Sequence, residues 1–228
     1  MQHAEARPHC DGIQERYFDR AVYRAASHPV VRSYAVPKIE YIAQKLPLQS
    51  QRILDVGCGN GVFTLPLAER VAGAIGLDRS ANMLRHLPWR PLIRGDAAYL
   101  PFKDAAFTLA FEANLLHHAD DPLGIVREMR RVSSDYVVLV EPNRLNPLMF
   151  AFGLVVRAER GTLRSSRRAL TAMVARAGLE VVAVAAMGMI SQNLTPTALV
   201  PLLRVFDREF AFGEYLVLIA RRITVAAG

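Results

Sequence analysis

Short apolar runs alternate with segments of helical periodicity along this chain, and proline, glycine or aspartate separates most of them. The run from Arg52 to Val56 is rich in apolar and β-branched residues, as in a strand that is covered on both faces of a sheet. Comparable runs recur, and several of them end at an acidic residue. The pattern predicts strands over residues 52–56, 73–77, 91–95, 135–140, 179–186 and 214–221.

Helical patterns occupy most of the intervals. Apolar residues recur at i, i+3, i+4 and i+7 from Ile39 to Leu46, and we expect Pro29 and Pro37 to interrupt the N-terminal helices. An Asp-Pro pair is a good N-cap and first turn, and a glycine commonly ends a helix. The predicted helices cover residues 12–27 and 36–46, the segment from Asp121-Pro122 to Val132, and residues 166–177 before Gly178.

A glycine-rich turn follows the first predicted strand. Gly57, Gly59 and Gly61 lie within five residues, which allows a tight turn with positive φ. We expect a helix to begin near Gly61 and to direct its free N–H groups at the turn, where a carboxylate or phosphate is favoured. The dinucleotide fingerprint Gly-x-Gly-x-x-Gly would require glycine at position 62, but that residue is Val62.

An acidic residue, Asp55, precedes this turn by two positions. The resulting Asp-x-Gly-x-Gly-x-Gly string resembles the nucleotide loop of class I S-adenosylmethionine-dependent methyltransferases. Residues 52–118 continue the resemblance in order: an acid that ends the second strand and would accept from a ribose diol, a helix start with an apolar residue against adenine, a Gly-Asp-Ala turn, and a fourth strand with a substrate-facing loop. The implied S-adenosyl-L-methionine contacts are Asp55, Gly57, Cys58, Gly59, Asn60, Gly61, Asp78, Arg79, Met83, Gly95, Asp96, Ala97, Glu112, Ala113 and Asn114.

The same resemblance implies the fold class, α/β, with a Rossmann-like, seven-stranded, mostly parallel sheet, an antiparallel last strand and helices on both faces. We expect an N-terminal helical cover over residues 1–48, the methyltransferase domain over 49–228, and an inserted helical cover over about 144–177 on the substrate side. In similar enzymes such N-terminal helices cover the cofactor, which would place Tyr17, Phe18 and Tyr23 near it. Core packing explains these aromatic residues equally well. The apolar segment 190–212 suggests a hydrophobic substrate, or again core packing.

The methyl group of such a cofactor is already activated, so the protein has to align an acceptor in line with the sulfur–methyl bond and to exclude water. We expect transfer to an oxygen or carbon atom of a small, lipophilic acceptor. His117 and His118 are the candidate catalytic residues, with Glu112 or Asn143 as orienting groups, and we hypothesise that His117 is the general base. A structural role for both histidines, as caps of the loop, is equally consistent with the sequence.

Composition agrees with one domain in a reducing compartment. The chain has 228 residues and is 52% hydrophobic, which is ample for a large core. Its two cysteines, Cys10 and Cys58, lack metal-ligand spacing, so we expect neither a disulfide framework nor a bound metal. The polar first residues and the ten-residue length of the longest apolar run, 147–156, argue against a secretory signal and a transmembrane segment. We expect a cytoplasmic protein.

The formal net charge of +7 comes almost entirely from arginine. Five arginines against one glutamate give +4 over residues 157–168, which favours a solvated helix face and leaves open a handle for an anionic substrate, an acidic carrier or a lipid headgroup. A nucleic-acid partner is disfavoured because stacking aromatic residues are absent from this cluster. The alternative functions are an RNA-modifying methyltransferase, an NAD-dependent dehydrogenase and a catalytically silent interaction protein; the sequence leaves the oligomeric state open.

Overall fold

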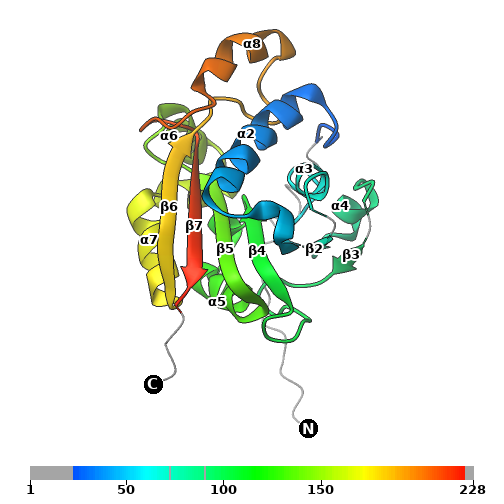
Figure 1. Ribbon diagram of the computed structural model, residues 1–228. Coiled ribbons are helices and arrows are strands. Elements are labelled where there is room, and N and C mark those ends of the chain that lie inside the picture. Colours follow the sequence, from blue (N-terminus) through cyan, green and yellow to red (C-terminus); the bar gives the residue numbers. More distant parts are fainter. Residues whose placement is uncertain (1–22, 72, 90, 224–228) are drawn as a thin grey trace.

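The computed structural model describes residues 23–71, 73–89 and 91–223. Its centre is a seven-stranded sheet with the order β3-β2-β1-β4-β5-β7-β6, flanked by helices on both faces (Figure 1). Strand β7 pairs antiparallel with both of its neighbours, and the other recorded strand pairings are parallel. The predicted fold class is therefore confirmed, including the antiparallel last strand.

The strands end close to their predicted positions. They are β1 (Arg52–Val56), β2 (Gly73–Asp78), β3 (Leu92–Arg94), β4 (Phe107–Ala113), β5 (Ser133–Pro142), β6 (Leu179–Met187) and β7 (Tyr215–Arg222). The α-helices are α2 (Pro29–Lys45), α3 (Thr64–Ala68), α4 (Ala81–Arg85), α5 (Pro122–Val132), α6 (Pro147–Val155), α7 (Arg167–Arg176) and α8 (Val200–Leu203). Short 3₁₀ helices are η1 (Leu48–Ser50), η2 (Leu116–His118), η3 (Arg157–Arg164), η4 (Thr197–Leu199) and η5 (Arg204–Phe206).

Each face of the sheet has its own hydrophobic core. One core joins α2 and α3 to the sheet through residues such as Tyr34, Ile39 and Phe111. The other joins α5 and α7 to the opposite face through residues such as Met129 and Val174. This burial explains the near-continuous apolar runs of the central strands, which have no solvent-facing side. Within the described residues, no helix is long and apolar enough to cross a membrane.

The sequence prediction of the N-terminal helices needs correction. Helix α2 runs without a break from Pro29 to Lys45 and contains Pro37, which we expected to interrupt it. His28 caps this helix, because its ring nitrogen accepts from Val30 N at 3.2 Å. Tertiary burial outweighs the local cost of Pro37: residues on both sides of it, including Tyr34 and Ile39, are fully buried.

The end of the other N-terminal helix was also predicted wrongly. Residues 12–22 and the expected cofactor contact Tyr17 lie outside the described residues. Residues 23–27 are described and form a coil and turn instead of a helix. Loop contacts hold this segment: Arg24 donates through Nη1 to Thr195 O at 2.8 Å, and Arg24 O accepts from Asn60 Nδ2 at 3.0 Å. These tertiary hydrogen bonds replace helical ones.

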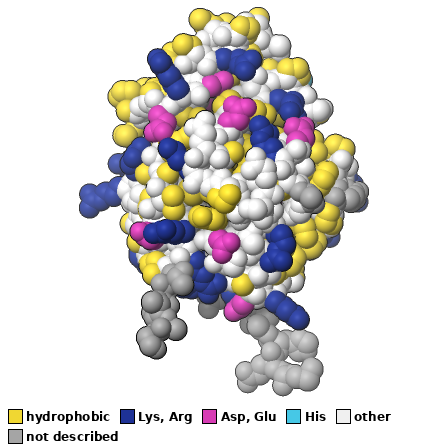
Figure 2. All heavy atoms as spheres, in the orientation of Figure 1, with side chains coloured by type: hydrophobic (Ala, Val, Ile, Leu, Met, Phe, Trp, Pro, Cys, Tyr) yellow, Lys and Arg dark blue, Asp and Glu magenta, His cyan; other side chains and the backbone are white. Residues whose placement is uncertain are grey.

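The segment between β5 and β6 forms α6, η3 and α7, so the predicted connection is helical. Ser166 caps α7 by accepting from Ala169 N, and Gly178 follows it with φ 76°, as the sequence indicated. In Figure 1, α6 and α8 lie at the end of the sheet toward which β6 points. On the face that Figure 2 shows, hydrophobic side chains gather over α8 and the neighbouring η5, where Leu202 and Val205 respectively are exposed. We retain the division into a cover over 1–48 and a domain over 49–228 as a proposal.

Candidate functional site

The glycine-rich turn lies between the ends of β1 and β2. Gly57, Gly59 and Gly61 have φ of 73°, 53° and 91°, which side chains rarely tolerate. The Asp78 carboxylate fastens the turn, since it accepts from Gly59 N at 2.8 Å and from Ser80 N at 2.7 Å. Desolvation by burial raises the pKa of Asp78 although these donors oppose the shift. Asp78, at the end of β2, thus holds in place the glycine-rich turn from which the sequence predicted a ligand site.

A cavity of about 380 Å³ opens beside this turn. Small-molecule sites typically enclose roughly 300–1,000 Å³, so its size suits a nucleoside ligand. Nine of the sequence-predicted contacts line it, from α4 and from the ends of four successive parallel strands: Gly57, Gly59, Asp78, Arg79, Met83, Gly95, Asp96, Ala97 and Asn114.

Six other predicted contacts do not line this cavity: Asp55, Cys58, Asn60, Gly61, Glu112 and Ala113. Asp55 is buried and accepts from Thr64 Oγ1 at 2.6 Å, so it ties the strand to α3. Desolvation by burial raises the pKa of Asp55 to about 7. A Cβ on Gly61 would lie 1.9 Å from Leu87 Cδ1, which shows that this glycine permits close packing against the segment after α4. Helix α3 begins at Thr64, three residues later than expected, although Leu65 N donates to Gly61 O.

Asn114 joins the cavity to the core of α2. It has φ 57°, an uncommon value for a residue with a side chain, and its amide donates to the Tyr34 hydroxyl at 2.8 Å. Tyr34 is fully buried between Phe63 and Tyr215, with ring centroids 5.5 and 4.9 Å away. The sequence did not indicate Tyr34 as a support of the site, because nothing in the pattern of α2 distinguishes it from an ordinary core residue.

Behind the cavity, two glutamates lie in contact at the ends of β4 and β5. Burial, together with the neighbouring charge of Glu141, raises the pKa of Glu112 well above its ordinary value. Glu141 accepts from Leu115 N at 3.0 Å, Leu116 N at 2.9 Å and His117 N at 3.2 Å, so it caps η2. Burial disfavours ionisation of Glu141, but the charge and hydrogen bond of His117 outweigh it and lower the pKa.

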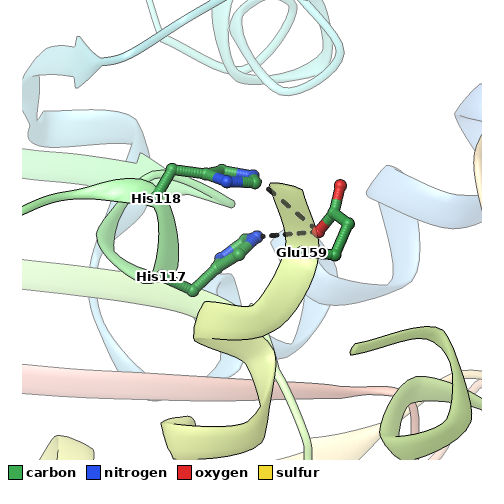
Figure 3. A group of neighbouring side chains, drawn as sticks. All are labelled: His117, His118 and Glu159. Atoms are coloured by element: carbon green, nitrogen blue, oxygen red, sulfur yellow. Dashed lines mark ion pairs between the residues drawn. The ribbon is translucent and has the colours of Figure 1, made fainter. Parts of the chain in front are cut away.

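His117 is enclosed by two carboxylates. Its Nδ1 lies 2.7 Å from Glu141 Oε2, and its Nε2 lies 3.4 Å from Glu159 Oε2 (Figure 3). Burial lowers the pKa of His117, but the charges of Glu141 and Glu159 and the hydrogen bond with Glu141 overcome this and raise it to about 9. Near pH 7 His117 therefore carries a proton on each ring nitrogen. In this form it can hold the neighbouring carboxylates in place, but it has no free nitrogen with which to accept a proton, which weighs against the hypothesis that it is the general base.

His118 lies at the boundary of two cavities. Its ring centroid is 3.9 Å from that of His117, and its Nε2 is 3.9 Å from Glu159 Oε2. Burial and the neighbouring charge of His117 lower the pKa of His118 to about 4, so it is neutral near pH 7. His118, Ala119 and Asp120 line both the 380 Å³ cavity and a second cavity of about 470 Å³.

The second cavity, which we call the basic cavity, lies between η2 and the inserted helices. Arg157, Arg160 and Arg164 of η3 line it, together with apolar side chains that include Leu170 and Met173. A Cβ on Gly161 would lie 1.7 Å from His117 O, so η3 approaches the histidine loop closely at a glycine. Sequence analysis counted Glu159 only as the one acid in the arginine cluster and did not place it beside the histidines, because only folding brings η3 against η2.

Comparisons with known proteins agree with this geometry. Residues 54–138 match the family model described as the methyltransferase domain. That segment spans β1 to β5 and contains both the glycine-rich turn and the two histidines. This part of the chain is therefore similar to the methyltransferase domain family, and the resemblance predicted from the sequence is confirmed.

Individual relatives match over less than half of the chain. The malonyl-[acyl-carrier protein] O-methyltransferase of Legionella pneumophila is 40% identical over 99 residues, which cover 39% of this chain and 34% of that protein. The demethylmenaquinone methyltransferase of Streptomyces avermitilis is 36% identical over 88 residues, 37% of this chain and 38% of that protein. The chain thus matches between a third and two fifths of the length of these two relatives.

A solved structure extends the fold similarity over nearly the whole chain. A SAM-dependent methyltransferase from Thermotoga maritima, described as a possible histamine N-methyltransferase, superposes with a TM-score of 0.66 at 20% identity. The superposition covers 92% of this chain and 94% of that one. At this identity the match establishes the fold, so the acceptor has to be argued from the site.

Proposed function

We propose that this protein is an S-adenosyl-L-methionine-dependent methyltransferase that methylates an oxygen or carbon atom of a small acceptor with an apolar body and an acidic group. One observation carries the proposal: the cavity beside the glycine-rich turn and the basic cavity share the wall formed by residues 118–120. Two ligands bound on either side of that wall would meet at His118.

The first cavity suits the cofactor. Asp78 and Asp96 offer carboxylate oxygens to hydroxyl and amino groups, and Met83 offers an apolar surface to a base. When bound there, the cofactor would supply a methyl group on a positively charged sulfur. The acidic residues at this edge, which include Asp120 and Asp121, would favour that charge. In this proposal Gly57 and Gly59 let the backbone approach the ligand closely.

The basic cavity suits the acceptor. Arg157, Arg160 and Arg164 would bind an acidic group, while Leu170 and Met173 would contact an apolar body. The names of the two relatives accord with this chemistry, because a malonyl group is acidic and a quinone is largely apolar. The protein's own contribution would be alignment, which can supply roughly 7–11 kcal/mol of a barrier.

Within this arrangement we propose that His118 contacts the reacting atoms as the general base and that His117 holds His118 in position. A neutral imidazole can accept a proton from an acceptor hydroxyl, and the low pKa of His118 limits it to acceptors that lose a proton readily. The methyl carbon would form its new bond to the acceptor as the sulfur takes the electron pair of the old one.

Calorimetry and labelling test the proposal in turn. Titration with S-adenosylhomocysteine should give heat with a 1:1 stoichiometry, and Asp78→Ala should remove most of it. Cell extract incubated with protein and methyl-labelled cofactor should then yield a labelled small molecule that retains an acidic group. Folded protein that gives no heat would contradict the cofactor assignment, and label recovered in RNA would replace the acceptor class with the RNA-modifying alternative.

A further inference from the structure

The space between η2 and η3 holds three side chains that transition metals bind readily. Figure 3 shows the His117 and His118 rings directed at the carboxylate of Glu159 from neighbouring positions on one loop. One ligand atom from each residue lies within 4.8 Å of the others. We infer that His117, His118 and Glu159 form a binding site for a divalent transition-metal ion of the zinc type, at the wall of the basic cavity.

The spacing of the three atoms fits an ion between them. His117 Nε2 and His118 Nε2 lie 3.4 and 3.9 Å from Glu159 Oε2. Direct charge-assisted hydrogen bonds are shorter, about 2.7–2.9 Å, as the 2.7 Å contact between His117 and Glu141 illustrates. Two ligands at about 2.0–2.1 Å from a tetrahedral ion are separated by about 3.4 Å. The two histidine–carboxylate distances therefore exceed this separation by at most about 0.5 Å, and all three ligand atoms lie within 4.8 Å of one another.

The surroundings of His117 are those of a metal ligand. Nδ1–H of a metal-bound histidine characteristically donates to a carboxylate, which orients the ring and directs Nε2 at the ion. Glu141 provides that carboxylate and is itself held by the backbone N–H groups of residues 115–117. A divalent ion would also balance the charges of Glu141 and Glu159, which lie on opposite sides of the same ring.

Two imidazoles and one carboxylate leave a coordination position free, as in catalytic zinc sites. His117 and His118 line the basic cavity, so a ligand there could reach the ion. The ion would take the place of the proton on His117 Nε2 and would occupy Nε2 of His118. If the proposed function holds, an acceptor oxygen bound to the ion would lose its proton to solvent, so the ion would replace His118 as the group that activates the acceptor, and the arginines of η3 would draw an anionic acceptor toward it. The ligand set disfavours Mg²⁺, which prefers oxygen ligands.

Metal binding can be measured without any methyl transfer. The full chain, freed of metal by chelator dialysis, should bind one Zn²⁺ in competition with a chromophoric chelator, and Co²⁺ in its place should give visible absorption bands typical of nitrogen and oxygen ligands. Glu159→Gln and His118→Ala should each weaken Zn²⁺ binding at least 10–100-fold. His86→Ala changes an exposed histidine outside the group and should bind Zn²⁺ like the unchanged chain.

Two results would overturn the inference: Zn²⁺ affinity unchanged in both Glu159→Gln and His118→Ala, or loss of binding in His86→Ala alone. Circular dichroism establishes that each variant is folded. If His118→Ala does not fold, Glu159→Gln, which preserves side-chain volume, decides the test. Heat on titration with S-adenosylhomocysteine is measured on the same samples. A chain that binds the nucleoside but no zinc refutes the metal site alone, whereas one that binds zinc but no nucleoside refutes the proposed function alone.

Discussion

The two cavities that meet at His118 are built in different ways. The cofactor-sized cavity is lined by glycines, small residues and acids that follow strands β1, β2, β3 and β4, so its parts come from short segments in chain order. The basic cavity combines η2 with η3 and α7, segments separated by some forty residues and by the whole of β5. Its lining includes the long side chains of Arg157, Arg160, Arg164, Leu170 and Met173, and Gly161 is the single glycine among the described residues that line it.

The cofactor-sized cavity is thus built by a sequence motif, and the basic cavity by an inserted segment. In a parallel sheet, successive strands place their carboxyl ends at one edge, so a site made there requires only the right residue after each strand. The basic cavity instead requires that a helical insertion fold back over that edge. Only the first kind of site is expected to be shared widely among proteins of this fold, and the second kind is where the acceptor would be chosen. Four experiments test this division, from the largest expected effect to the smallest.

Gly161→Ala should disrupt the basic cavity and spare the other one. The added Cβ would lie 1.7 Å from the backbone oxygen of His117, which cannot rotate away as a side chain can. We expect a loss of about 3 kcal/mol in the free energy of unfolding and a large loss of methyl transfer and zinc affinity, with nucleoside affinity changed less than about threefold. Gly73→Ala, where the nearest atoms belong to Arg52 at an ordinary contact distance of 3.7 Å and lie away from both cavities, is the control. Equal loss of nucleoside and zinc binding in Gly161→Ala would contradict the claim that the two cavities are built independently.

Asp55→Asn should change how stability depends on pH. The pKa of Asp55 is raised to about 7 by burial, so between its ordinary pKa of 3.8 and pH 7 the folded state holds a proton that the unfolded state has lost. The contribution of Asp55 to the free energy of unfolding is thus greatest at low pH and is lost as pH rises through 7. From pH 5 to pH 8 the loss amounts to about 2–3 kcal/mol, which the variant should not show. Urea unfolding of both proteins at these two pH values measures it, and parallel pH profiles would contradict it.

Asp78→Asn should weaken nucleoside binding by about 10-fold or more, while acceptor-side zinc binding stays unchanged. The amide retains one acceptor oxygen for Gly59 N or Ser80 N, but its NH₂ group would face the other donor. Loss of a hydrogen bond to a charged acceptor costs about 1.5–3 kcal/mol. Calorimetry with S-adenosylhomocysteine measures the affinity, and Asp104→Asn, at an exposed loop acid, is the control. An unaltered affinity in Asp78→Asn would remove the central acid from the proposed site.

Tyr34→Phe should have the smallest effect. The variant loses the hydroxyl that accepts from Asn114 at 2.8 Å but keeps the ring between Phe63 and Tyr215. A hydrogen bond of this kind contributes about 0.5–1.5 kcal/mol, which corresponds to a two- to tenfold loss of nucleoside affinity if Asn114 moves. Tyr41→Phe changes a tyrosine of the same helix away from the cavity and should leave the affinity unchanged. Identical affinities in the two variants would show that Asn114 holds its position without Tyr34.

Sequence analysis predicted features formed by neighbours in the sequence better than features formed by distant segments. The helix over Pro122–Val132, its Asp121 cap and the Ser166 cap of α7 agree with local rules, because the residues that satisfy these helix ends are neighbours in sequence. Pro37 misled because its cost is local, whereas the burial of α2 against the sheet is a tertiary effect. Asp55 shows the limit within the motif itself: its spacing to the glycines is visible in the sequence, but its burial against Thr64 is not.

The succession of strands and helices along the chain, the glycine-rich turn and the acids at the strand ends were determined by the sequence alone, because each depends on a few adjacent residues and on the period of the apolar pattern. The charge states of His117 and His118, the pairing of Glu112 with Glu141, and the approach of Glu159 were decided only by the tertiary structure. These properties depend on burial and on distances between residues far apart in the chain, which no local pattern encodes.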